Sequence, residues 1–193
     1  MKINPTIRNK RINEMRHLYD LIIKDNESDK EYIYTVIKET INENKEELEK
    51  SLLDIIYKDL EGTIAIVLTE ARKMYKSFDE DKIIDLKDML YNKDGKTLEE
   101  RVKGWMKEEN IMNLFFHICL ILDTETFSLI HQTIKNKVNV DYVEIVGEGG
   151  CDTCAEYCDG EVYKESDVEL PPYHPGCMCE VVYYEKEDIL EEL

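Results

Sequence analysis

The sequence predicts an α+β protein, in which a mostly helical body carries a small C-terminal β module held together by zinc. Three observations support this fold class. Apolar residues recur at helical spacing through most of residues 1–137, and they alternate with polar residues at strand spacing after Lys137. A cysteine and histidine array then fills residues 151–179. At 193 residues, the chain allows one domain, or one domain plus a small module.

The first half of the chain is expected to form long helices. Ser28 to Glu31 has the form of a capping box, which predicts a second helix running to about Leu60 and bent near residues 42–44. Gly62 is the predicted end of that helix. The first helix, before Ser28, is predicted by an apolar stripe of Ile12, Met15, Leu18, Tyr19, Ile22 and Ile23.

Further helices are expected over residues 63–78 and 79–91. Thr97 to Glu100 forms a second capping box, which opens a helix through Trp105. That helix either continues to residue 122 or breaks near Asn110, and residues 124–137 continue as helix.

The pattern changes to strands after Lys137. Residues 138–146 and 181–184 have strand character, and a turn with a short strand is expected over residues 159–163. Residues 147–150 are glycine-rich and lead directly to Cys151. The last residues, 186–193, are expected to form a short acidic helix or a frayed tail.

Two clusters of metal-binding residue types lie about twenty residues apart in the module. The first is Cys151-x-x-Cys154, and the second is Pro-Pro-Tyr-His174-Pro-Gly-Cys177-x-Cys179. A structural zinc ion takes four nitrogen or sulfur ligands in a tetrahedron. We predict that Cys151, Cys154 and Cys177 bind it, with either Cys179 or His174 as the fourth ligand. Cys158 is left over from this set.

A structural zinc ion is favoured because the module is small and rich in charge. Segments of about 40 residues or fewer usually need a metal, disulfides or a partner to fold. Disulfides and free thiols are the alternatives, but we expect no signal peptide and therefore a reducing compartment. No His-Glu-x-x-His helix is present, and the cysteine order differs from that of zinc deaminases. We therefore assign no catalytic residues and expect no enzyme activity.

Charge is unevenly distributed along the chain. The formal net charge is -18, and residues 141–193 contain sixteen acidic and only two basic side chains. Such a module repels phosphate and suits a basic protein partner or a bound cation. The start of the chain is basic, which allows a weak DNA contact there, although a solvated helix face explains the same charges. The most apolar stretch, residues 111–122, is too short to span a membrane.

The order of these features resembles the C-terminal domain of the phage head-morphogenesis family, the minor head proteins similar to the F protein of phage Mu. The similarity rests on a Thr-Glu pair at Thr124 and Glu125, on Cys-x-x-Cys, and on the Pro-Pro-Tyr-His-Pro-Gly-Cys-Met-Cys ending. It covers about residues 97–184. Asp123 and Met178 stand where the family commonly has arginines, and both changes remove positive charge.

The resemblance implies two regions, a helical N-terminal region over residues 1–96 and a Mu F-like domain over residues 97–193, with a zinc module at about 147–185. It also implies a structural, portal-associated minor capsid protein that is made in the bacterial cytoplasm and resides in the virion, with portal or other capsid proteins as partners. Two other functions stay open on the residues alone: a zinc-dependent nuclease or effector, and a regulatory zinc-binding interaction module.

Overall fold

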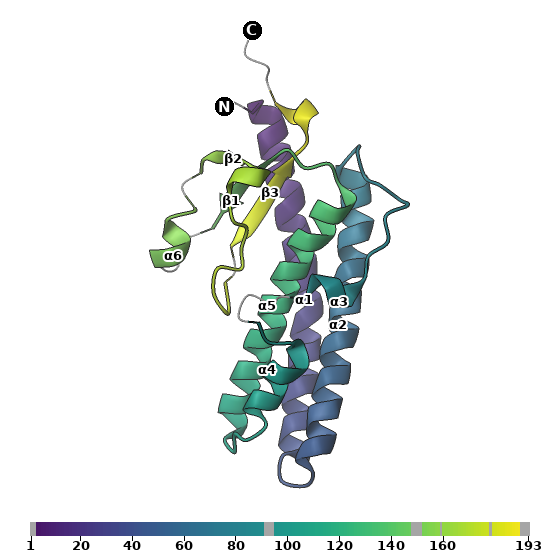
Figure 1. The fold of residues 1–193 in the computed structure, drawn as a ribbon, viewed down its shortest axis with the longest axis vertical. Helices are drawn as coiled ribbons and strands as arrows, with labels where there is room; N and C mark the ends of the chain where they lie inside the picture. The colour runs from purple at the N-terminus through teal and green to yellow at the C-terminus, as the bar shows by residue number, and fades with distance from the viewer. Residues whose placement is uncertain (1–2, 91–94, 148–151, 159, 178, 190–193) are drawn as a thin grey trace.

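The computed structural model describes residues 3–90, 95–147, 152–158, 160–177 and 179–189. Three long helices form the body of the molecule: α1 (Pro5–Thr40), α2 (Lys45–Met74) and α5 (Ile111–Lys137). The short helices α3 (Leu86–Met89) and α4 (Leu98–Trp105) lie beside them, and a small sheet lies against the side of α1 in the half of the molecule that holds both chain ends (Figure 1). The predicted α+β class is confirmed.

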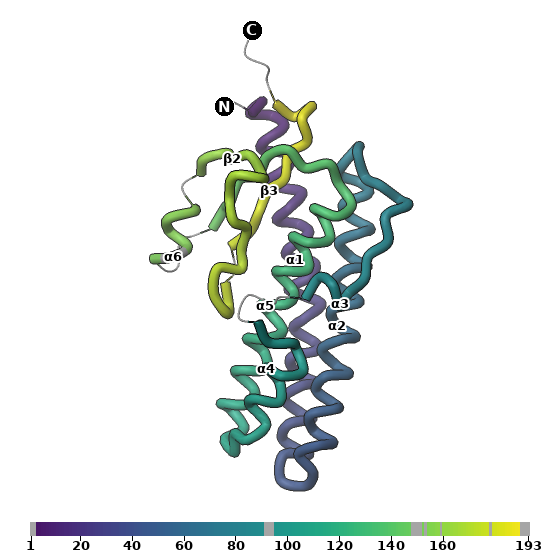
Figure 2. Tube along the Cα trace, in the orientation of Figure 1, coloured from purple at the N-terminus to yellow at the C-terminus, as the bar shows by residue number. Residues whose placement is uncertain are grey.

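The sheet is antiparallel and has the strand order β2-β1-β3. Its strands are β1 (Tyr142–Val146), β2 (Val162–Lys164) and β3 (Glu180–Tyr184). In the central strand, Val143 lies opposite Tyr163 on one side and Tyr183 on the other. Strand β3 packs on α1, where the backbone N–H of Val181 donates to the Tyr19 hydroxyl at 3.0 Å. The trace in Figure 2 shows the last strand running beside the first helix.

Each long helix begins at an asparagine cap. The Asn4 side chain accepts a hydrogen bond from Thr6 N–H, and Pro5 occupies the first turn, where its missing N–H costs nothing. Asn44 caps α2 and Asn110 caps α5 in the same way. The capping box at Thr97, which opens α4, is confirmed, and of the two alternatives left open for the following segment the structure has the break near Asn110.

Two predicted helix boundaries are wrong. Helix α1 runs through Ser28, whose hydroxyl donates to the Asp25 carbonyl inside the helix. The apolar stripe continues past it through buried Ile33 and Ile37, so packing against α2 overrides the local capping signal. Helix α2 likewise continues through Gly62, which faces Asp25 of α1.

The helix predicted over residues 79–91 is also wrong, because the described part of that segment is helical only in α3. The Lys137 side chain is 6% exposed, and its ammonium group donates to the backbone carbonyls of Asp79, Glu80 and Lys82. These bonds hold the segment as a loop. The predicted terminal helix is reduced to a 3₁₀ turn at Lys186–Asp188, and residues 190–193 lie outside the described part of the chain.

The buried apolar side chains form two clusters. The upper cluster lies between the sheet, the first half of α1 and the ends of α2 and α5. The lower cluster lies between the second half of α1, the first half of α2, α4 and the first half of α5. Both clusters contain residues from either side of residue 97.

Two arginines of the basic N-terminal segment form ion pairs inside the molecule. Arg8 binds Glu144 of β1, which is 1% exposed and also accepts from the Tyr184 hydroxyl at 2.8 Å. Arg11 donates to Glu185 and Asp188 at 3.1 and 3.0 Å. The first helix is thereby tied to the segment that follows β3.

Helix α5 is long and apolar enough to cross a membrane, but 67% of its most apolar window is buried inside the molecule. A core helix of a folded domain gives the same pattern.

Candidate metal centre

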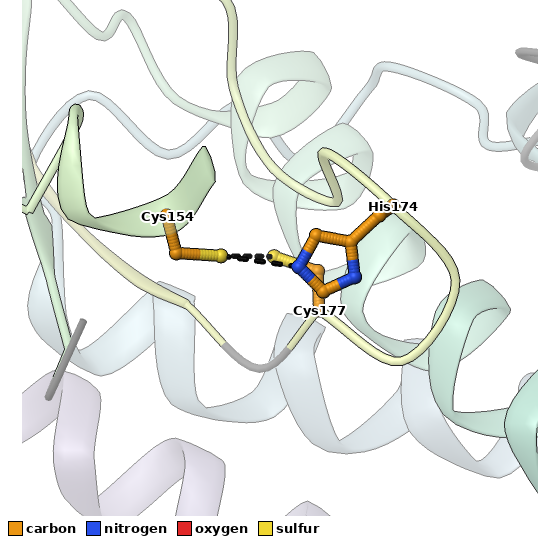
Figure 3. A group of neighbouring side chains, drawn as sticks. All are labelled: Cys154, His174 and Cys177. Carbon is orange, nitrogen blue, oxygen red and sulfur yellow. Dashed lines mark hydrogen bonds between the residues drawn. The ribbon is translucent and has the colours of Figure 1, made fainter. Parts of the chain in front are cut away.

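Three side chains from two distant segments converge beside the sheet. The Cys154 Sγ atom lies 3.2 Å from His174 Nε2 and 3.8 Å from Cys177 Sγ (Figure 3). All three ligand atoms lie within 4.8 Å of one another, and both cysteines are buried. This group can hold a metal ion.

The spacing of these atoms suits tetrahedral coordination. Two sulfur atoms bound to one zinc ion at about 2.3 Å along tetrahedral directions are about 3.8 Å apart, and a sulfur–nitrogen edge is about 3.5 Å. The observed separations of 3.8 and 3.2 Å are close to these edges. Only small side-chain movements are therefore needed to bind an ion.

Cys154 is held by a short helical turn. It lies in α6 (Asp152–Ala155), and its carbonyl accepts the N–H groups of Tyr157 and Cys158 at 3.1 and 3.0 Å. These bonds curl the backbone around Cys154, and its side chain points toward the second loop (Figure 3).

The second loop presents His174 and Cys177 from the two ends of one β-turn. The Cys177 N–H donates to the His174 carbonyl at 3.0 Å, with Pro175 and Gly176 at the central positions. Gly176 has a φ of 74°, which matches the third residue of a type II turn. The His-Pro-Gly-Cys sequence therefore brings both ligands to the same place.

Helix α5 supports this turn directly. The Gly176 N–H donates to Thr124 Oγ1 at 3.1 Å, and the Thr124 hydroxyl donates to the Leu120 carbonyl at 2.7 Å. A Cβ atom at Gly176 would lie 2.5 Å from Leu120 Cδ1, and the φ of 74° is one that L side chains rarely adopt, so glycine is strongly favoured here. The threonine of the Thr-Glu pair thus positions the ligand loop. Its neighbour Glu125 is completely buried and pairs with Arg101.

The histidine has the tautomer that a metal requires. His174 Nδ1 lies 3.0 Å from the Pro175 carbonyl oxygen, which can only accept a hydrogen bond. Nδ1 therefore carries a proton, and in the neutral imidazole Nε2 keeps its lone pair for the site. Metal-binding histidines are commonly oriented by such a bond.

The other two described cysteines of the module lie side by side. Cys158 Sγ is 3.7 Å from Cys179 Sγ, and a Cβ at Gly147 would be 3.2 Å from the Cys158 sulfur. The Cys179 thiol also interacts with the thiols of Cys154 and Cys177. Burial raises the pKa of Cys179 well above its usual range, so the thiol stays protonated without a cation.

An aromatic pair joins the two ligand-bearing segments. The rings of Tyr157 and Tyr173 stack with centroids 4.2 Å apart, and the Tyr173 hydroxyl donates to the Glu169 carbonyl. Such a pair contributes about 0.5–1.5 kcal/mol beyond its buried area. It brings the segments together independently of any ion.

Of the five predicted ligands, the structure groups Cys154, His174 and Cys177 and places Cys179 beside them. Cys151 lies outside the described residues. The predicted ligand set does not include Cys158, which contacts Cys179. No role was predicted for the Thr124 hydroxyl either. The Thr-Glu resemblance was the available signal for Thr124; none indicated the Cys158–Cys179 contact.

Comparison of the chain with protein-family models, with curated proteins and with solved structures finds no match.

Proposed function

We propose that the metal is zinc, that its role is structural, and that the protein is a minor head protein of a phage or prophage. The single observation that carries the proposal is the convergence of Cys154, His174 and Cys177. These residues belong to the two sequence segments on which the family resemblance rests. The same resemblance supplies the location, a virion near its portal, and the partners, portal or other capsid proteins.

The ligand chemistry supports zinc over other common ions. Two thiolates and an imidazole are typical ligands of structural zinc, whereas magnesium and calcium prefer oxygen atoms. A structural site is completed by a fourth protein ligand rather than by water. We assign His174 as the third ligand, bound directly to the metal. Cys179 and Cys151 are the two candidates for the fourth position.

Metal analysis of the purified protein tests the zinc part of the proposal. We expect about one zinc ion per chain in the unaltered protein, and its loss in Cys154→Ser and His174→Ala. Cys119→Ser is the matched control, because Cys119 lies on α5 and belongs to none of the thiol contacts described above. Zinc retained in both ligand variants would refute the site. Comparing Cys151→Ser with Cys179→Ser identifies the fourth ligand.

The virion role needs a separate experiment. We expect the protein in purified phage particles and in pull-downs with a phage portal protein. Zinc binding without any particle association would refute the head-protein proposal while leaving the metal site intact. Purified protein is expected to leave DNA and RNA uncut; zinc-dependent cleavage would instead support the effector alternative.

A further inference from the structure

A cavity of about 570 Å³ lies between α4 and α5, next to the turn that holds His174. Pro175 of that turn forms part of its wall. The volume falls within the range of about 300–1,000 Å³ that is usual for small-molecule sites. None of the predicted metal ligands lines it, so the cavity is separate from the metal centre.

Two aromatic side chains, Trp105 and His117, line one side of the cavity. The rings of Trp105 and His117 stack with centroids 3.4 Å apart and planes 9° apart. Leu120 and Ile121 add aliphatic surface, and Gly104 leaves open space, because a Cβ built there meets nothing within 4 Å. This wall suits a planar apolar group.

The charged residues that line the cavity are mostly basic, whereas the chain as a whole is acidic. Its described lining includes Lys96, Arg101 and Lys107 but only one carboxylate, Glu100, whereas the whole chain carries a net charge of -18. Arg101 is paired with buried Glu125. Both lysines are exposed, and neither forms an ion pair with an acidic residue in the described ranges. Their charges are therefore available to an anion bound in the cavity.

We propose that this cavity binds a small ligand that combines a flat apolar body with an anionic group. The apolar body lies against Trp105, and the anionic group faces Lys96 and Lys107. The proposal does not depend on the metal or on the virion role.

Trp105 is the only tryptophan of the chain, so its fluorescence reports directly on the cavity. Two probes of similar shape separate the contributions: anilinonaphthalene sulfonate, which is anionic, and phenylnaphthylamine, which is neutral. Both are expected to quench Trp105. The K96E/K107E double variant should weaken binding of the sulfonate by about tenfold or more and that of the neutral probe by less than about twofold.

The matched control is K73E/K76E, which makes the same charge change on two exposed lysines, one in the last turn of α2 and one just after it. It should leave both probes unaffected. Gly104→Leu fills the open space and should block both probes while the circular dichroism spectrum stays helical. The proposal is overturned if Gly104→Leu binds both probes as the unaltered protein does. Equal losses of sulfonate binding in the two lysine variants, or none in K96E/K107E, would also overturn it.

Discussion

The lower helical bundle and the cysteine module are stabilised by different interactions. The lower bundle encloses aliphatic side chains that are completely buried, such as Leu52 and Ile56. The module is short, and it gathers thiols, one imidazole and the stacked rings of Tyr157 and Tyr173 beside the partly buried Val168 and Leu170. The difference shows how one chain combines a bundle held by apolar burial with a short module in which thiols and an imidazole converge.

The two regions meet at α5. Its first half belongs to the lower cluster, while Thr124 and Leu120 hold the ligand turn of the module. A perturbation of the bundle core should therefore change global stability, and a perturbation of the turn should change metal affinity. Five experiments test this separation, in order of decreasing effect.

Removing the metal with a chelator should have the largest effect. Structural zinc sites contribute roughly 10–16 kcal/mol of apparent binding free energy at neutral pH. We expect hydrogen–deuterium exchange to increase across residues 152–179, with the lower bundle still protected. The Cys154→Ser variant should reproduce this pattern without chelator. Equal loss of protection in the bundle would show that the two regions do not differ as described.

Leu52→Ala should destabilise the bundle by about 2–5 kcal/mol, because it leaves a cavity at a completely buried position. Denaturant unfolding measures this loss, and metal content is expected to stay unchanged. Lys50→Ala, on an exposed position of the same helix, is the control and should change stability by less than about 0.5 kcal/mol. Metal loss in Leu52→Ala would contradict the separation.

Stability of the bundle should depend on the ionisation of Asp59. Burial, followed by a hydrogen bond with Asp29, raises the pKa of Asp59 to about 8 from an ordinary value of 3.8. The folded state therefore holds a proton that the unfolded chain releases, and stability falls as pH rises from about 4 to 8. The slope is at most about 1.4 kcal/mol per pH unit.

Asp59→Asn should remove this pH dependence, as measured by denaturant unfolding between pH 5 and pH 9. Asp54→Asn, on an exposed position of α2, should retain it. Identical slopes in Asp59→Asn and the unaltered protein would show that Asp59 is not the responsible group.

Gly176→Ala should weaken metal binding, since the alanine would occupy a left-handed conformation and clash with Leu120. The conformational strain alone costs about 1–2 kcal/mol, or about tenfold in affinity. Gly160→Ala is the control. Its alanine would occupy the same left-handed conformation without a clash, because nothing lies within 4 Å of its Cβ position. Adding Leu120→Ala should recover part of the lost affinity. No recovery would mean that the clash is unimportant.

Thr124→Ala should have the smallest effect, about 1 kcal/mol or roughly fivefold in metal affinity, because one hydrogen bond to Gly176 is lost. Thr124→Ser keeps the hydroxyl and should bind metal nearly as tightly as the unaltered protein. Competition with a chromophoric chelator measures both variants. Equal affinities for the alanine and serine variants would show that the hydroxyl does not support the turn.

Sequence patterns predict the elements of this fold better than their boundaries. Strand β3 and the capping box at Thr97 follow from local residue types. Ser28 and Gly62 predict helix boundaries that the structure does not have, because packing between α1 and α2 outweighs a local preference of about 1 kcal/mol. The loop after α2 depends on Lys137, nearly 60 residues away, and no local pattern reports such a contact.

Local sequence patterns are also insufficient to predict all of the candidate metal ligands. Spacing predicts that the two cysteine clusters approach each other, but it does not decide between His174 and Cys179. The choice depends on the turn at Gly176 and on its contact with α5, which are tertiary features. The Cys158–Cys179 contact likewise depends on the path of the chain past Gly147.

The contacts between α1 and β3 have a consequence for synthesis on the ribosome. Tyr19 and Arg11 emerge first, yet their partners Val181, Glu185 and Asp188 are translated last. The first half of α1 is therefore fully covered only after β3 and the turn that follows it have been made, whereas its second half packs on α2.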